Sequence, residues 1–204
     1  MNPVAGQAVA QPGPPLRVTG VEARAVVVTM RRPLRVSIGA VTQAPLLLVD
    51  LRTDGGVAGR AYLFGYHTYT LEPLRSLVRT LGEMVTGDRL APFDLERKLR
   101  ARLTLLGPHN LTGIALAGLD MAAWDALGVA HGLPLATLLG GEPRPIPAYN
   151  SNGLGIMPAE EAADEAAELV AEGFRAIKIR LGRPTLEEDL AAVRAGGSVG
   201  KNVL

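Results

Sequence analysis

Residues 174–181 read FRAIKIRL, a run in which apolar and charged side chains alternate, and this period of two predicts a β-strand. Side chains at i and i+2 share one face of a strand, so Lys178 and Arg180 project together. The two isoleucines and the leucine fill the other face. Buried cations are costly without an anion, so the pair indicates an anionic ligand such as a carboxylate. An exposed edge strand with solvated charges is the alternative.

The segments around this strand predict two βα units. Residues 146–150 form a short strand, and Pro158 opens a helix that Gly173 ends. Thr185 and Glu188 have the spacing of a capping box, which starts a second helix. The order strand, helix, strand, helix is typical of a parallel sheet. Two such units cannot close a barrel, so we expect the sequence to be incomplete.

The helix between Pro158 and Gly173 carries six acidic side chains. We interpret them as a solvated face rather than a cation site, because charged runs on helices usually face water. They are Glu160, Glu161, Asp164, Glu165, Glu168 and Glu172.

The turn before this helix has two glycines of a dinucleotide-binding fingerprint, Gly153 and Gly155. Pro158 stands where the third glycine is expected, and no acidic residue ends the next strand to hold a ribose. A nucleotide-binding domain therefore stays an alternative, and a test for NAD binding would distinguish it.

Upstream, strands are followed by helices, which predicts an α+β domain over the first 140 or so residues. Residues 17–30, 45–51 and 57–66 favour strands in an antiparallel meander, with an Asp-Gly hairpin signal at 54–55. Helical periodicity then predicts helices at about 71–81, at about 95–105 after a cap at Asp94, and at about 111–131.

Asp120 and Asp125 flank Trp124 on the last of these helices. At about 100° per residue the two carboxylates lie roughly 140° apart around the helix, so they do not form an acid–base dyad. We interpret them as structural hydrogen-bonding residues that contact a neighbouring loop.

The composition is that of a globular protein and excludes several classes of function. Of 204 residues 48% are apolar, and 21 basic against 20 acidic residues give a net charge of +1. This nearly neutral charge gives no indication of nucleic-acid binding. The lack of cysteine excludes disulfides and thiolate metal sites. No apolar run is long enough to predict a membrane span. Residues 1–16 are interpreted as a disordered tail without signal-peptide features.

Several segments together resemble the mandelate racemase/muconate lactonizing branch of the enolase superfamily. Residues 119–128, LDMAAWDALG, match its signature on the long helix of the capping domain. Residues 134–141 match the link into the barrel, and residues 173–178 match barrel strand two. Residues 33–45 and 61–66 are similar to the mandelate racemase group in particular. The resemblance extends over about residues 17–194.

This resemblance implies an α+β capping domain at residues 17–141, followed by the first two βα units of a truncated (β/α)₈ barrel at residues 142–204. It implies Mg²⁺-dependent abstraction of the proton α to a carboxylate. The reaction would be 2-hydroxy acid racemisation, as in an isomerase, or acid-sugar dehydration, as in a lyase. The substrate would be a small-molecule carboxylate, and the complete protein is expected to be a cytoplasmic homo-oligomer.

The resemblance also implies site residues. The family lysine that contacts the substrate carboxylate matches Lys178, and the family base two residues later matches Arg180. Ser151 matches a residue near the carboxylate. The substrate-lining positions of the cap match Leu34, Val36, Ile38, Val41, Phe64 and Tyr66.

Two departures from the family pattern bear on activity. An arginine stays protonated at ordinary pH, so Arg180 is a poor general base. A poor base at this position argues against a racemase that uses two bases. It is compatible with an acid-sugar dehydratase, in which a base on the other face abstracts the proton. The family's Mg²⁺ ligands are carboxylates on strands three, four and five, which this chain is expected to lack. A truncated, non-catalytic chain is therefore a further alternative.

Overall fold

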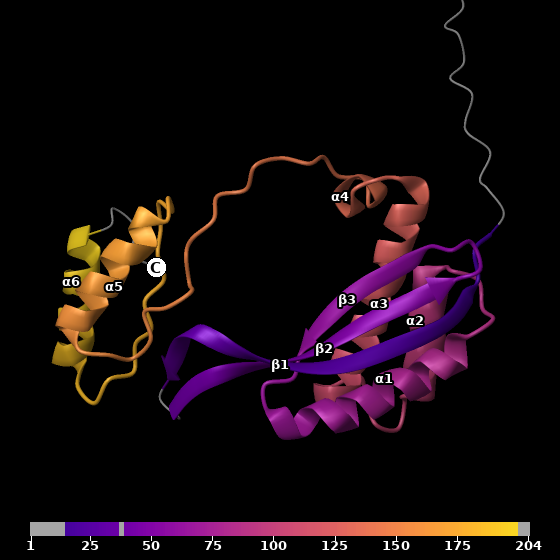
Figure 1. The fold of residues 1–204 in the computed structure, drawn as a ribbon, viewed down its shortest axis with the longest axis horizontal. Coiled ribbons are helices and arrows are strands. Elements are labelled where there is room, and N and C mark those ends of the chain that lie inside the picture. The colour runs from indigo at the N-terminus through magenta and orange to yellow at the C-terminus, as the bar shows by residue number, and fades with distance from the viewer. Residues whose placement is uncertain (1–14, 37–38, 200–204) are drawn as a thin grey trace, which may run out of the picture. The chain divides into compact units, whose positions relative to one another are not determined.

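A computed structural model describes residues 15–36 and 39–199. The described residues divide into two compact units (Figure 1). The first comprises the residues up to 26 together with 46–142, and the second comprises 27–45 together with the residues from 143 onward. The distal part of the first hairpin therefore belongs to the same unit as the C-terminal helices. Most of the predicted tail, residues 1–14, and the predicted lining residue Ile38 lie outside the described residues.

Three strands form one sheet in the order β1-β2-β3, with β1 at Val18–Val36, β2 at Gly39–Thr53 and β3 at Ala58–Phe64. The first two strands are longer than predicted, because β1 continues through Pro33. Proline lacks an N–H group but is tolerated in an edge strand, and β1 lies at the edge of this sheet. β2 and β3 are antiparallel, and Leu47 pairs with Leu63.

Helices pack on one face of this sheet (Figure 1). A 3₁₀ turn at Thr68–Thr70 leads into α1 at Leu71–Val85, which is followed by α2 at Pro92–Arg102, α3 at Asn110–His131 and the short α4 at Leu135–Leu138. Asp94 was predicted to cap the second helix, but Ala91 is the capping position and Asp94 lies in the first turn. Pro92 explains the earlier start, because proline fits the first turn of a helix.

Glycine allows β3 to approach α3 closely. A Cβ atom at Gly59 would overlap the carbonyl oxygen of Ala122 and lie 2.7 Å from the Cβ atom of Ala126. At Gly118, a Cβ atom would lie 2.7 Å from a methyl group of Leu63. The small residues of the long helix therefore serve to bring a strand against it.

By length and composition, α3 is the one described helix that is apolar enough to cross a membrane, although the sequence pattern predicted no such span. Its apolar residues belong to the core of the first unit, where Leu116, Leu119 and Ala122 are buried. Packing inside a folded unit accounts for this hydropathy, as in the core helix of a globular protein.

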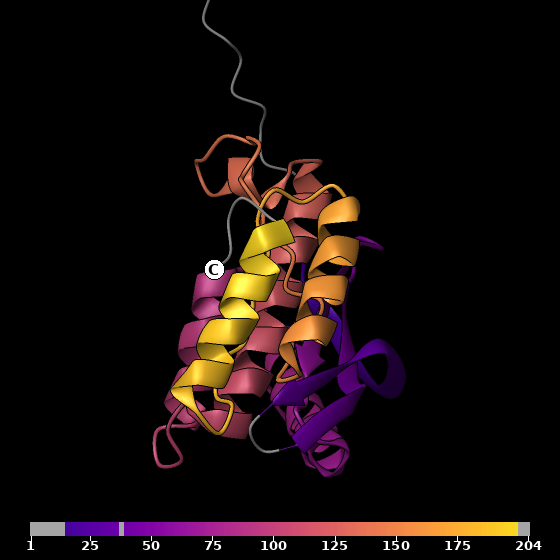
Figure 2. The same cartoon turned by 90° about the vertical axis from the view of Figure 1, so that its left-hand side faces the viewer.

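The second unit contains α5 at Ala159–Ala171 and α6 at Leu186–Val199, which lie side by side (Figure 2). Both helices were predicted, and reciprocal hydrogen bonds between Thr185 and Glu188 confirm the capping box. The small core of this unit consists of Leu154, Ala162, Ala166, Leu169, Ile177, Ile179 and Ala192.

The two strands predicted for this unit are wrong as continuous elements. Residues 146–150 and 174–181 pair only at an isolated parallel bridge between Asn150 and Ile177. A parallel strand needs partners and helices on both faces, and Ile146 at the start of the first segment is 77% exposed. The described residues thus contain the first contact of a parallel sheet rather than the sheet itself.

The contact between β3 and α3 gives a direct test of the first unit. We expect Gly59→Ala to destabilise it by about 1–3 kcal/mol, because the added methyl group overpacks this contact. Gly20→Ala is the matched control, since no atom lies within 4 Å of a Cβ at that position. Urea unfolding of both variants checks the prediction. Equal stability of Gly59→Ala and the parent chain would contradict it.

Candidate functional site

The extended segment around Lys178 separates an exposed ammonium group from a buried apolar side. Ile177 and Ile179 are 0% and 7% exposed, whereas Lys178 is exposed. The Lys178 amide donates to the carbonyl oxygen of Asn150 at 2.9 Å. Leu181 was predicted to share the buried side, but it is 57% exposed because Gly182, with φ +120°, turns the chain after it.

Arg180 has a different environment from Lys178. Its side chain donates from Nη1 to the carbonyl oxygen of Gly153 at 2.8 Å, and its amide donates to the carbonyl oxygen of Leu154 at 3.0 Å. The residue is half-buried. Arg180 therefore stabilises the loop after residue 150 by hydrogen bonds from its guanidinium and its backbone amide.

Asn150 was missed by the sequence analysis, although it ends the predicted first strand and precedes the predicted site residue Ser151. It is only 4% exposed. Its Nδ2 donates to Glu172 Oε2 at 2.9 Å, and its Oδ1 accepts from the Asn152 amide at 3.0 Å. Ser151 itself is exposed. A buried amide with these partners holds the loop that carries Ser151.

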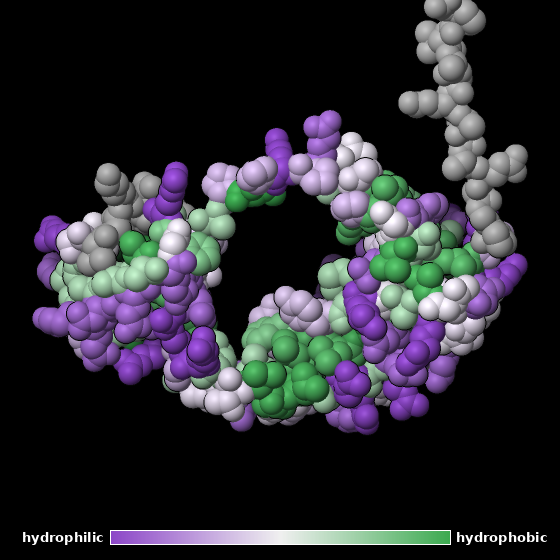
Figure 3. Space-filling model, turned by 45° about the horizontal axis from the view of Figure 1, so that its top comes forward, coloured by the Kyte–Doolittle hydropathy of each residue, from purple (hydrophilic) through white to green (hydrophobic). Residues whose placement is uncertain are grey.

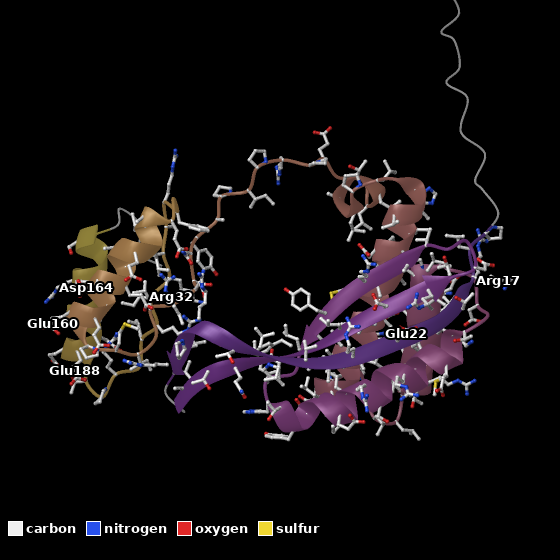
Figure 4. The ribbon with its side chains drawn as sticks, in the orientation of Figure 1. Arg17, Glu22, Arg32, Glu160, Asp164 and Glu188 are labelled. Carbon is white, nitrogen blue, oxygen red and sulfur yellow. The ribbon has the colours of Figure 1, made fainter. Side chains whose placement is uncertain are left out.

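Arg32, which Figure 4 labels, belongs to the hairpin. It binds two glutamates of α5 and the glutamate at the C-terminal cap of that helix. Its Nη1 lies 2.9 Å from Glu172 Oε1, and its Nη2 lies 3.0 Å from Glu168 Oε2. Its Nε lies 3.9 Å from Glu165 Oε1. Hydrogen bonds from Arg32 and then from Asn150 hold the pKa of Glu172 below its ordinary value. The same ion pairs raise the pKa of Arg32.

The prediction that the acidic side chains of this helix form only a solvated face is therefore wrong. Besides the contacts of Arg32, Glu161 lies 3.1 Å from Arg35, and Glu165 accepts from the Leu154 amide at 2.7 Å. The face of the C-terminal helices that Figure 3 shows is largely hydrophilic. The arginines come from a hairpin far away in sequence, so helical periodicity carried no sign of them.

The glycine turn is occupied by contacts within the protein. A Cβ atom at Gly153 would lie 2.9 Å from the carboxyl carbon of Glu165, and one at Gly155 would lie 2.7 Å from the Arg35 carbonyl oxygen. The Leu154 amide already donates to Glu165. A carboxylate at the N–H groups of this turn opposes a bound phosphate, so the geometry argues against the nucleotide-binding alternative.

The predicted lining residues are divided between the two units. Leu34, Val36 and Val41 are half-buried on the hairpin of the second unit. Phe64 and Tyr66 belong to the first unit, where their rings pack edge to face with centroids 5.1 Å apart. The structure brings Lys178, Arg180 and the Ser151 loop into one unit. The rest of the lining stays a prediction.

Asp125 has the structural role expected from its helix position. Its Oδ2 accepts from the Arg60 amide at 2.8 Å, so its partner is strand β3 rather than a loop. Partial burial, and then the nearby charge of Glu96, raise the pKa of Asp120. The two carboxylates therefore lie in different environments.

Metal-binding side chains do not gather in groups of three or more within residues 15–36 and 39–199. The carboxylates of Glu161, Glu168 and Glu172 are already engaged by arginines.

The fold is an antiparallel α+β capping domain followed by α5 and α6. These helices and the extended segments before them correspond to the first two βα units of a (β/α)₈ barrel, with the strands represented by a single parallel bridge. Residues 18–140 match the sequence profile of the mandelate racemase/muconate lactonizing enzyme N-terminal domain. The chain belongs to this family of the enolase superfamily.

Two solved structures and one curated relative show the extent of the similarity. An enolase from the alpha-proteobacterium BAL199, with bound magnesium, is 39% identical, with a TM-score of 0.87 over 90% of this chain and 52% of that one. A Bradyrhizobium enolase with magnesium and mandelic acid is 43% identical, with a TM-score of 0.83 over 91% and 51% of the two chains. The 3,6-anhydro-alpha-L-galactonate cycloisomerase of Streptomyces coelicolor is 30% identical over 77% of this chain and 44% of its own length.

The chain spans about half the length of the curated relatives that it matches. These relatives include cycloisomerases, epimerases and dehydratases. The family therefore comprises several reactions.

The lowered pKa of Glu172 makes the contact between hairpin and helix pH-dependent. Such a contact stabilises the fold above the ordinary carboxyl pKa and is lost as the pH falls through the folded value. We expect the Glu172 side-chain carboxyl resonance to titrate below the ordinary value of 4.5. Arg32→Ala should move this titration upward. ¹³C NMR of the carboxyl groups measures both effects.

Arg194→Ala is the control for this titration. Arg194 is exposed on α6, so the substitution removes one positive charge and leaves the ion pairs of Arg32 in place. An unchanged Glu172 titration in Arg32→Ala would show that the ion pair does not form in solution.

Proposed function

We propose that this protein contributes to abstraction of the proton α to the carboxylate of a small organic acid, with Lys178 binding that carboxylate. The observation that carries the proposal is the exposed Lys178 between two buried isoleucines. The resemblance of residues 173–178 to barrel strand two implies that Lys178 matches the carboxylate-binding lysine of the family. Membership of the family supports the reaction class.

The environment of Lys178 supports an anion-binding role. Within the described part of the chain, no ion pair engages Lys178, whereas Lys98 binds Asp88. An ammonium group placed beside a carboxylate stabilises the second negative charge that develops when the α proton leaves. Lys178 would thus bind the substrate and stabilise the enediolate.

Arg180 favours dehydration of an acid sugar over a two-base racemisation. Its guanidinium stays charged and donates to the Gly153 carbonyl oxygen, so it does not accept the α proton. In this proposal Arg180 fixes the loop of Ser151 and adds positive charge near the carboxylate.

The hairpin would determine which substrates fit. Arg32 and Arg35 flank Leu34 in sequence, and both bind glutamates of α5. These ion pairs restrain the backbone that carries Leu34 and Val36. Together with Ile38, Val41, Phe64 and Tyr66, these residues are proposed to line the substrate pocket.

The remaining predictions belong to the same proposal. Residues 17–141 would be the capping domain and residues from 142 the barrel, in a cytoplasmic homo-oligomer. Magnesium, present in the related structures described above, would supply Lewis-acid stabilisation of the enediolate when bound. A non-catalytic role remains the alternative, and the following experiment separates the two.

A chimera tests the role of Lys178. Residues 15–199 would replace the matching half of the Bradyrhizobium enolase, and α-proton exchange of mandelate in D₂O would be followed by ¹H NMR. Lys178→Ala should lower kcat/KM by the equivalent of about 2–4 kcal/mol, because a charged group that stabilises the transition state is lost.

Lys98→Ala is the matched control for this chimera, because it also replaces a lysine by alanine but in the first unit, away from Lys178 in sequence. It should leave kcat/KM unchanged. A Lys178→Ala activity within about threefold of the parent would contradict the assigned role. If the parent Bradyrhizobium enolase exchanges the α proton of mandelate under the same conditions, a folded chimera that shows no exchange would contradict the proposed reaction class for these residues and favour the non-catalytic alternative.

A further inference from the structure

A cavity of about 480 Å³ lies in the second unit between the first turns of α5 and α6. Met157, Pro158 and Ala159 line it from the α5 side, and Arg183, Glu188 and Ala191 line it from the α6 side. Most of its wall is carbon. Lys178, Arg180 and Ser151 do not line it, so it is separate from the site of the proposed function.

Arg183 is a buried cation in the wall of this cavity, with a side chain that is only 5% exposed. Its Nε donates to the Met157 carbonyl oxygen at 2.8 Å. Its Nη1 donates to the Arg180 carbonyl oxygen and to Asp189 Oδ1, both at 3.1 Å.

The second terminal nitrogen of Arg183, Nη2, is buried and has no hydrogen-bond partner among the residues that the structure describes. Buried guanidinium groups in proteins normally have all their donors satisfied, because an unpaired donor loses its hydration without compensation. This nitrogen is therefore an unused hydrogen-bond donor.

The electrostatics of the cavity limit the charge of that ligand. Asp189 already neutralises Arg183, and Glu188 adds a negative charge at the wall. The first turns of α5 and α6 both border the cavity, and helix N-termini favour an anion. A single negative charge is accommodated, whereas a dianion would be repelled by Glu188.

We propose that this cavity binds a small monocarboxylate with an apolar body, whose oxygen accepts a hydrogen bond from Arg183 Nη2. The apolar wall takes the hydrocarbon part and the guanidinium takes the carboxylate. Because Nη2 itself has no contact with solvent, binding needs a small movement of the wall. Met157 lines the cavity, and we assign this movement to its side chain, since methionine is flexible and adapts its packing.

Benzoate is the probe for the test, and benzyl alcohol is its uncharged counterpart. Both are titrated into the full 204-residue chain and followed by amide shifts in ¹H–¹⁵N NMR. We expect benzoate to shift the amides of Ala159, Glu188 and Ala191 saturably and to bind at least tenfold more tightly than benzyl alcohol.

Variants identify the site. Ala191→Phe fills the cavity and should weaken benzoate binding at least tenfold, whereas Ala167→Phe, on an exposed position of α5 outside the cavity wall, should leave it unchanged. Arg183→Lys keeps the charge but removes Nη2, and should reduce benzoate affinity to that of benzyl alcohol. Ala191→Phe keeps the test decisive if Arg183→Lys fails to fold.

Three results would overturn the proposal. Equal affinity for benzoate and benzyl alcohol would mean that a buried water satisfies Nη2. Unchanged benzoate affinity in Ala191→Phe would place the probe elsewhere. Loss of binding in Lys178→Ala with retention in Ala191→Phe would assign the carboxylate to the site of the proposed function.

Discussion

The buried amide of Asn150 joins the separate segments of the second unit. The backbone of Asn150 forms two hydrogen bonds with residues 176–178. Its N–H group donates to the Ala176 carbonyl oxygen at 2.8 Å, and its carbonyl oxygen accepts from the Lys178 N–H group at 2.9 Å. Its side chain donates to Glu172. An unsatisfied buried amide costs about 1–3 kcal/mol, so these bonds favour a single register. That register buries Ile177 and leaves Lys178 exposed.

Glu172 extends this network to the hairpin, because the carboxylate that accepts from Asn150 also binds Arg32. The backbone that carries Leu34 is thereby tied to α5, and the position of Lys178 depends on the same cluster. In the proposed function, Lys178 binds the carboxylate and Leu34 helps to select the substrate. The hydrogen bonds of Asn150 and Glu172 hold the backbone of both residues. The cavity at Arg183 lies at the opposite, N-terminal end of α5 and depends on a different ion pair, with Asp189.

Helices α1, α3, α5 and α6 could be predicted closely, because periodicity and capping are local properties of the sequence. β3 was also predicted closely, at residues 57–66. The extents of the other strands could not be predicted, because they depend on partners: β1 continues through Pro33 as an edge strand, and residues 174–181 form a ladder bridge with Asn150 alone. The partners of the α5 glutamates had no local signal, since Arg32 and Glu172 are 140 positions apart. Lys178 was predicted as a site residue from strand alternation and family resemblance, and this role stays a prediction, whereas the contacts of Asn150 and Arg183 required the tertiary structure.

The parallel pairing at Asn150 is the central claim of this account, and hydrogen-bond scalar couplings measure it directly. Couplings across the hydrogen bonds should appear between the Lys178 nitrogen and the Asn150 carbonyl carbon, and between the Asn150 nitrogen and the Ala176 carbonyl carbon. Their detection in the isotope-labelled chain is the predicted result. Absence of both couplings, with rapid exchange of the Asn150 and Lys178 amides, would contradict the register on which the position of Lys178 rests.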